Sequence, residues 1–305
     1  MKPPAFWFRP PGATAWALRP VGAMYHWAGV LRRRAAAPLR LPVPVNFVGN
    51  LSLGGAGKTP VALSLLARLA ALGLAPHALS RGYGGAAKGP LLVDPSRHDA
   101  FEVGDEPLLL ARTAPVWVAR DRAAGGLAAV AAGAGVVVMD DGHQNPALFK
   151  NLNLVVSDGG VGFGNGLVFP AGPLRESVAA GLARADAVVV VGEDVHGVAP
   201  IAAKHGLPAL KGRLVPDPAA AARLRGRRVL AFAGIGRPRK FFDSLAAVGA
   251  DIAETPVGGG GAGGGAKTGG GFRGGVGDDG QGPRPSPPRA ARRRGGPAGQ
   301  SAMGR

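Results

Sequence analysis

The feature that most constrains the fold is a glycine-rich octapeptide, Ser52-Leu-Gly-Gly-Ala-Gly-Lys-Thr59. It matches the pattern G-x-x-x-x-G-K-[ST] except at its first position, where serine replaces glycine. An apolar run at residues 45–48 precedes it, and an amphipathic stretch that starts at Pro60 follows it. A strand, a glycine-rich loop and a helix in this order form a phosphate-binding P-loop. The sequence therefore predicts a site for a nucleoside triphosphate.

Each residue type in this motif has a task in phosphate binding. The small residues let backbone N–H groups close around the phosphates, and the helix N-terminus adds the positive end of its dipole. Lys58 is expected to reach the β- and γ-phosphates, and the Thr59 hydroxyl to bind Mg²⁺. We expect the following residues to hold the nucleotide: Ser52, Leu53, Gly54, Gly55, Ala56, Gly57, Lys58 and Thr59.

Acidic and basic residues follow several of the other predicted strands. Asp140 and Asp141 end the apolar run 136–139, which is the arrangement that holds Mg²⁺ or its water in P-loop enzymes. Asp105 and Glu106 stand at a predicted helix start, where acids also favour the helix dipole. Arginines are suited to bidentate contacts with phosphate, and the candidates are Arg81, Arg120, Arg122 and Arg175.

The alternation of short apolar runs with amphipathic stretches predicts an α/β fold. We expect a P-loop NTPase-like parallel sheet flanked by helices on both faces. A linker rich in glycine and proline, residues 159–173, is expected to lead into a second, smaller and incomplete α/β domain. The predicted divisions are an N-terminal segment 1–41, a P-loop domain 42–175, a second domain 176–257 and a tail 258–305.

The tail differs abruptly from the rest of the chain. Residues 258–305 hold 19 of the 52 glycines, with many prolines and arginines and almost no apolar periodicity. Such a composition cannot bury enough apolar surface to fold, so we expect the tail to be disordered. A shifted reading frame in a GC-rich gene would give the same composition, and we favour that interpretation.

The N-terminal segment combines aromatic residues with arginines. Trp7, Trp16 and Trp27 alternate with basic residues such as Arg19 and Arg33. Aromatics at a headgroup boundary beside arginines suit an interfacial membrane helix, and an ordinary packed helix with a solvated basic end fits equally well. We expect neither a transmembrane helix nor a signal peptide.

The formal net charge of +17 is compatible with nucleic acid, anionic membranes or phosphorylated substrates as partners. The chain has no recognised nucleic-acid-binding motif, so we expect no nucleic-acid partner. The chain has no cysteine, which excludes disulfides and thiolate metal sites. We expect a monomer.

The motifs, taken in order, resemble the tetraacyldisaccharide 4′-kinase family of lipid A biosynthesis. The resemblance covers the chain up to about Val257 and is carried by Val48–Pro60, Ser80–Gly85, Gly104–Pro107, Asp140–Gln144, Phe163–Gly166, Pro170–Glu176 and Phe232–Gly236. It implies transfer of phosphate from ATP, with Mg²⁺, to the 4′-hydroxyl of a tetraacyldisaccharide 1-phosphate, giving lipid IVA. It also implies a peripheral enzyme on the cytoplasmic face of the bacterial inner membrane, bound to an anionic membrane surface.

The resemblance also implies roles for individual residues. Asp105 matches the catalytic base, Lys58 and Thr59 match the P-loop pair, and Asp140 and Asp141 match the acids that handle Mg²⁺. Five further residues are expected to contact substrate or phosphate: Arg81, Glu106, Arg120, Gln144 and Arg175.

Two departures from the family pattern stand out. The histidine that usually follows the glutamine of the Asp-Asp-Gly motif is displaced to His143, and no histidine occurs after His205. The second departure removes the histidine that assists the catalytic aspartate in the family, so we expect this chain to bind ATP but turn over little substrate. A P-loop switch ATPase of the partitioning or maturation type is the alternative, although Leu53 stands where those proteins usually have lysine. A non-catalytic nucleotide-binding remnant is a further alternative.

Overall fold

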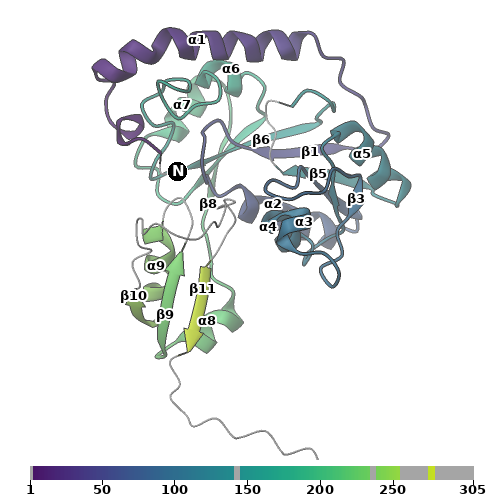
Figure 1. Ribbon diagram of the computed structural model, residues 1–305, viewed down its shortest axis with the longest axis vertical. Helices are drawn as coiled ribbons and strands as arrows, with labels where there is room; N and C mark the ends of the chain where they lie inside the picture. The colour runs from purple at the N-terminus through teal and green to yellow at the C-terminus, as the bar shows by residue number, and fades with distance from the viewer. Residues whose placement is uncertain (1–2, 141–144, 234–237, 255–273, 279–305) are drawn as a thin grey trace, which may run out of the picture.

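The computed structural model describes residues 3–140, 145–233, 238–254 and 274–278. Its largest element is an eight-stranded sheet with the order β3-β4-β2-β5-β1-β6-β7-β8 (Figure 1). The strands are β1 (Val45–Gly49), β2 (Pro76–Ser80), β3 (Leu91–Leu92), β4 (Val116–Val118), β5 (Val136–Asp140), β6 (Leu152–Asp158), β7 (Ala187–Val191) and β8 (Ala209–Gly212).

All neighbouring strands of this sheet run parallel except β3 and β4, which are antiparallel. Every residue of β2, β5 and β7 is buried. Continuous apolar runs such as Val136–Met139 therefore form strands covered on both faces, as parallel sheets require. The predicted fold class, a P-loop NTPase-like parallel sheet flanked by helices, is confirmed.

The helices cover both faces of the sheet. Successive side chains of a strand point to opposite sides, so the apolar strands present apolar side chains on each face. Val48 and Val138 pack with Leu66 of α2, whereas Phe47 and Met139 lie in the same apolar cluster as Ala129 of α5. The first face carries α2 (Lys58–Ala71), α4 (Asp105–Leu110) and the adjoining α3 (Ala100–Val103), and the second carries α5 (Arg122–Ala131), α6 (Val178–Leu182) and α7 (Val198–Lys204).

The sheet pairing corrects the predicted domain boundary at residue 176. Strand β7 pairs in parallel with β6, and β8 pairs in parallel with β7, so both belong to the large sheet. Residues 176–212 therefore extend the P-loop domain and do not begin a second one. Local sequence shows that a strand forms but not which sheet it joins, because the pairing partner lies elsewhere in the chain.

After β8 the structure has α8 (Pro218–Leu224) and a three-stranded sheet with α9 (Pro238–Ala247). The sheet has the order β10-β9-β11, formed by β10 (Asp251–Glu254), β9 (Arg228–Ala233) and β11 (Gly274–Asp278). Strand β11 is antiparallel to β9, so the expectation that all of 258–305 lacks regular structure is wrong for residues 274–278. A strand edge offers unpaired N–H and C=O groups that a glycine-rich segment can also pair with. The other tail residues lie outside the described ranges.

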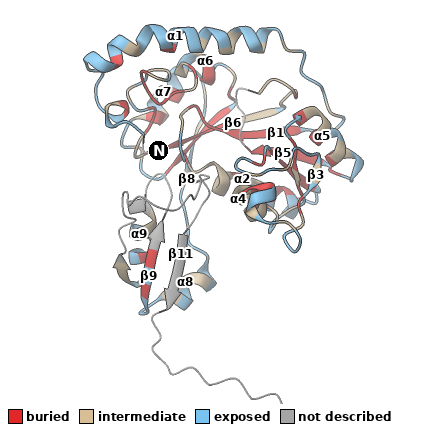
Figure 2. Ribbon diagram, viewed as in Figure 1, coloured by how far each residue is buried: buried red, intermediate tan, exposed pale blue. Residues whose placement is uncertain are grey.

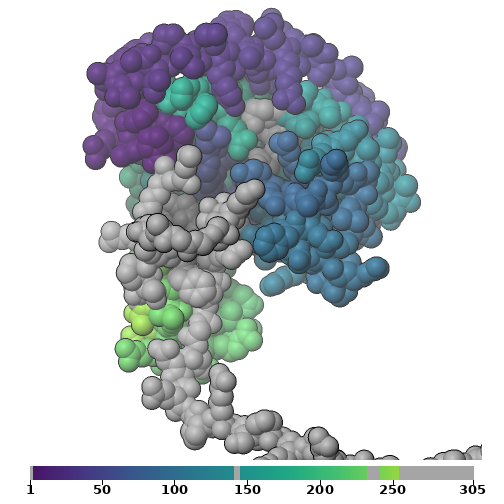
Figure 3. Space-filling view, in the orientation of Figure 1, coloured from purple at the N-terminus to yellow at the C-terminus, as the bar shows by residue number. Residues whose placement is uncertain are grey.

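The N-terminal segment forms a short 3₁₀ helix, η1 (Ala5–Phe8), and a long helix, α1 (Ala13–Arg34), that lies across the α6 and α7 side of the molecule (Figures 1 and 2). Its inner stripe, which includes Ala15 and Gly22, is buried. The opposite stripe is apolar yet exposed, with Trp16 at 52%, Trp27 at 59% and Leu31 at 63%. The helix is thus both packed against the body and apolar on its outer surface. Figure 3 shows the N-terminal segment, in purple, along one side of the molecule.

Candidate active site

The glycine-rich loop joins β1 to α2 as the sequence predicts. The N-cap Gly57 has a φ of 81°, a conformation that favours glycine, and the helix starts at Lys58. A Cβ atom added at Gly54 or Gly55 would meet no atom within 4 Å, so there is open space in front of both residues. An open loop of small residues that leads into a helix N-terminus fits the phosphate groups of a nucleotide.

Asn50 holds this loop in shape and was not among the predicted site residues. Its side chain is only 1% exposed, and Nδ2 donates to the carbonyl oxygens of Ser52 at 2.8 Å and Gly54 at 3.2 Å. A polar residue directly after a buried strand, inside the Val48–Pro60 motif, was the signal available in the sequence. The two hydrogen bonds turn these loop carbonyls toward the Asn50 amide and so help to fix the shape of the loop.

The Ser80–Gly85 loop and the start of α4 are packed against each other. A Cβ atom at Gly85 would lie 2.5 Å from the Glu102 carbonyl oxygen, and one at Gly104 would lie 2.7 Å from that of Tyr83. This close approach brings two predicted motifs together, so exposed Arg81 and half-buried Asp105 belong to adjoining loops. Glu106 is also half-buried, at the second position of α4.

Strands β2, β5 and β1 are neighbours and parallel, so their carboxyl ends meet at one edge of the sheet. Asp140 ends β5 in register with Val48 of β1 and is only 1% exposed. A buried carboxylate at this edge, with the Thr59 hydroxyl at the first turn of α2, is the type of oxygen donor set that Mg²⁺ takes beside phosphates. Asp141 and Gln144 lie outside the described residues.

The predicted arginines have different surroundings. Arg120 is exposed, and its guanidinium donates to the Ala86 carbonyl oxygen at 3.4 Å. Arg122 is buried, and its Nη1 donates to the Ala119 carbonyl oxygen. Arg175 is half-buried and follows Leu174, which forms an antiparallel bridge with Ser52 of the loop. Arg175 is therefore placed beside the loop, whereas the described contacts of Arg122 are to its own helix N-terminus.

Residues 170–177, which we call the strap, lie against the loop. The Leu53 N–H donates to the Pro173 carbonyl oxygen at 2.6 Å, and the Arg175 N–H donates to the Leu51 carbonyl oxygen at 2.7 Å. The sequence predicted a linker ending at Pro173. The structure instead makes this segment part of the loop's support, because its backbone groups pair with those of the loop.

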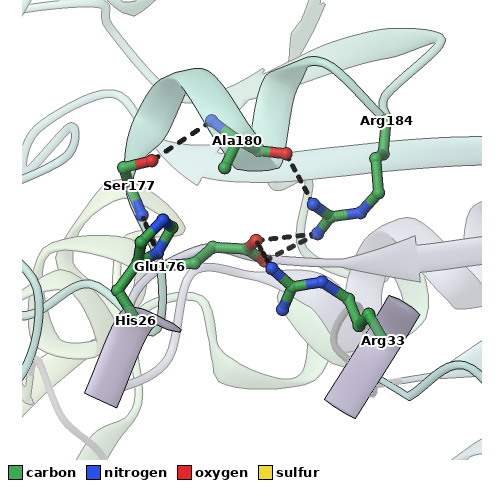
Figure 4. Close-up of polar contacts among 6 residues, drawn as sticks. All are labelled: His26, Arg33, Glu176, Ser177, Ala180 and Arg184. Atoms are coloured by element: carbon green, nitrogen blue, oxygen red, sulfur yellow. Dashed lines mark hydrogen bonds and ion pairs between the residues drawn. The ribbon is translucent and has the colours of Figure 1, made fainter. Parts of the chain in front are cut away.

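A cluster of charged groups surrounds Glu176 of the strap. Glu176 is 1% exposed and accepts hydrogen bonds from Arg184 at 2.8 Å to each carboxylate oxygen, and Arg33 lies 3.3 Å away (Figure 4). The pKa of nearby Lys150 is lowered from 10.5 to about 8, mainly because burial disfavours the charged form. Arg184 adds to this lowering, and Glu176 opposes it.

The lowered pKa of Lys150 gives a pH-dependent stability. Between pH 8 and 10.5 the unfolded chain holds a proton that the native lysine lacks, so stability rises with pH in this window. Relative to Lys150→Met, we expect the free energy of unfolding of the unaltered chain to rise by about 3 kcal/mol across the window. Urea denaturation at a series of pH values measures the difference. A difference independent of pH would show that Lys150 titrates normally.

Comparison with known proteins identifies the family. The model of the family described as tetraacyldisaccharide-1-P 4′-kinase matches residues 14–257. This chain belongs to the tetraacyldisaccharide-1-P 4′-kinase family. Membership of this family confirms the resemblance, makes the chain a kinase by class and excludes the switch-ATPase alternative. The matched region stops where the glycine-rich tail begins.

Curated relatives of this kinase family match most of the chain. A tetraacyldisaccharide 4′-kinase of Rhodospirillum centenum is 61% identical over 256 residues, covering 83% of this chain and 76% of the relative. One from Methylobacterium sp. is 59% identical over 258 residues, covering 84% and 77%. The crystal structure of LpxK from Aquifex aeolicus in complex with ATP is 31% identical, with a TM-score of 0.64, and the match covers 79% of this chain and 80% of that one.

In the described residues, no helix combines the length and the apolar character needed to cross a membrane.

Proposed function

We propose that this kinase transfers the γ-phosphate of ATP to the 4′-hydroxyl of tetraacyldisaccharide 1-phosphate, giving lipid IVA. The observation that carries the proposal is the meeting of three motifs at one sheet edge: the loop before α2, buried Asp140 and the Asp105 loop. A phosphate-binding loop, a carboxylate for a metal ion and a carboxylate for proton removal are the parts that phosphoryl transfer to an alcohol requires. Family membership supports tetraacyldisaccharide 1-phosphate as the proposed acceptor.

The loop and helix residues have the task of holding the nucleotide. Backbone N–H groups of residues 52–57 and the N-terminus of α2 would surround the phosphates, and Lys58 would neutralise charge on the transferred group. Thr59, Asp140 and Asp141 would hold Mg²⁺, which when bound shields the phosphate charge from the attacking oxygen. Because phosphoryl transfer depends mainly on position and charge, these residues are proposed to lower the barrier without covalent chemistry.

Asp105 is proposed to accept the proton of the sugar hydroxyl. Asp105 is the first residue of α4, and the preceding Gly104 is in close contact with the Ser80–Gly85 loop. Five other side chains would contact the substrate or the phosphates, namely Arg81, Glu106, Arg120, Gln144 and Arg175.

The assignment is tested with labelled ATP, Mg²⁺ and tetraacyldisaccharide 1-phosphate in detergent micelles. We expect a bis-phosphorylated product carrying label at the 4′ position. Because no histidine follows His205, the rate is expected to be low, so the chain should be in excess over substrate. Product no more abundant than with Lys58→Ala would contradict the assignment and leave the nucleotide-binding remnant as the better interpretation.

The outer stripe of α1 is proposed to bind the membrane surface that contains the lipid substrate, as a peripheral contact on the cytoplasmic side. Its exposed residues Trp16, Trp27 and Leu31 share one helical stripe, and three arginines occupy the last turn. Apolar side chains enter the interface while arginines attract anionic headgroups. This arrangement supports a monotopic attachment through α1.

A triple variant in which serine replaces Trp16, Trp27 and Leu31 should bind anionic vesicles roughly a hundredfold more weakly. Each replacement should cost about 1 kcal/mol of binding free energy, because an apolar side chain no longer enters the interface. Vesicle sedimentation at two salt concentrations measures the binding. Added salt should weaken the binding of the unaltered chain, because it screens the attraction between the arginines and the anionic headgroups. The matched control replaces three exposed apolar residues elsewhere: Leu72, Leu127 and Val215. Equal losses for both triple variants would remove α1 from the membrane contact.

A further inference from the structure

The strap, residues 170–177, connects two parts of the molecule that are far apart in the sequence. Its backbone pairs with the glycine-rich loop: the Leu53 N–H donates to the Pro173 carbonyl oxygen, and the Arg175 N–H donates to the Leu51 carbonyl oxygen. The strap also meets the N-terminal helices. The Trp7 indole donates to the Pro170 carbonyl oxygen at 3.0 Å. The Ser177 N–H donates to His26 Nδ1 at 3.4 Å. One short segment therefore contacts both the phosphate loop and α1.

Glu176 is the residue through which the strap is tied to α1 by charge. Its carboxylate is 1% exposed and is contacted by Arg33 of α1 and by Arg184 after α6 (Figure 4). A buried carboxylate needs such partners, because an uncompensated charge in the interior is strongly destabilising. Arg33 therefore helps to set where Glu176 sits. Arg175 directly precedes Glu176 in the chain. Arg33 therefore also helps to position the Arg175 N–H, which donates to the Leu51 carbonyl oxygen.

The geometry of the loop is sensitive to such a shift. Asn50 fixes the carbonyl groups of Ser52 and Gly54 from inside, and the strap fixes Leu51 and Leu53 from outside. Binding residues must be held within about 0.5 Å of their productive positions to be effective. A strap that relaxes away from the loop would release one of its two supports.

We propose that Glu176 is a positioning residue for the phosphate loop, and that docking of α1 through Arg33 raises the affinity of the loop for nucleotide. The proposal rests on the proposed function, in that the loop must bind MgATP. It implies a reciprocal effect, because coupling between two binding events is equal in both directions. MgATP should therefore stabilise the docked position of α1.

The test compares two neighbouring arginines of α1. Arg33 is half-buried against Glu176, whereas Arg34 is exposed, so Arg33→Met and Arg34→Met remove the same charge from the same turn. MgATP binding is measured by titration calorimetry on the full chain in lipid-free buffer. Arg33→Met is expected to raise the Kd about tenfold, within the usual range of coupling between sites. Arg34→Met should leave the Kd unchanged, and Arg33→Lys should recover part of the loss.

Loss of folding is distinguished from loss of positioning. An unfolded fraction lowers the number of sites bound at saturation, whereas a displaced loop raises the Kd. Leu245→Ala, which truncates a buried side chain of α9, serves as a variant that lowers thermal stability away from the loop. It should leave the Kd of the folded fraction unchanged. Glu176→Gln, which loses charge at nearly constant shape, should raise the Kd as Arg33→Met does.

Hydrogen exchange supplies the reciprocal measurement. MgATP should slow amide exchange in residues 25–34 of the unaltered chain and have less effect in Arg33→Met. If the unaltered chain does not bind MgATP, the proposed function fails. If the unaltered chain binds MgATP but Arg33→Met and Glu176→Gln bind it with the Kd of the unaltered chain, the positioning role of Glu176 is wrong while the proposed function stands.

Discussion

Asp105→Asn is expected to lower kcat roughly 10²- to 10⁴-fold, the usual worth of general-base catalysis. The amide has nearly the same shape as the carboxylate and can occupy the first position of α4, so the fold around it should persist. Gly104 is in close contact with the Tyr83 backbone, which fixes the start of α4 beside the Arg81 loop. The affinity for MgATP should change little, because in the proposed mechanism Asp105 contacts the acceptor hydroxyl.

Single-turnover measurements with the kinase in excess make low rates measurable and separate the chemical step from substrate binding. Glu102→Gln is the matched control, since it removes an exposed carboxylate from α3, the helix just before α4. It should leave the rate within the error of the unaltered chain. An Asp105→Asn rate similar to that of the control would remove Asp105 from the mechanism.

Lys58→Met should affect binding and rate together. Lys58 starts α2 directly after the glycine-rich loop, and in the proposed function its ammonium group contacts the terminal phosphates. Hydrogen bonds to charged groups contribute about 1.5–3 kcal/mol, so the affinity for MgATP should fall roughly ten- to a hundredfold. The rate at saturating ATP should also fall, because charge on the transferred group would lack its neutralising partner.

Titration calorimetry measures the affinity, and the single-turnover assay measures the rate. Lys204→Met is the control. It removes the same charge from an exposed lysine in the last turn of α7. Unchanged MgATP affinity in Lys58→Met would show that the nucleotide is not held by this loop, and the proposed kinase site would have to be placed elsewhere.

Predictions about local segments agree closely with the structure. The apolar runs 45–48 and 136–139 appear as β1 (Val45–Gly49) and β5 (Val136–Asp140), and the loop lies between β1 and α2 as its motif requires. These features depend on apolar periodicity, on helix N-terminal signals and on glycine at particular positions, all of which are local properties of the chain. The N-terminal segment was ambiguous, since one periodic helix can have both a packed stripe and an exposed apolar stripe.

The family and the residue types of the candidate site were thus determined by the sequence itself, because glycine, lysine and acidic residues at fixed spacings specify phosphate chemistry locally. The tertiary structure alone decided that β7 and β8 join the large sheet, and that the predicted linker supports the phosphate loop. It also decided that Arg33 of α1 meets Glu176 of the strap. These arrangements depend on backbone groups and charges that are far apart in the sequence. A buried carboxylate or an open strand edge meets its partner only once the fold has brought the two together.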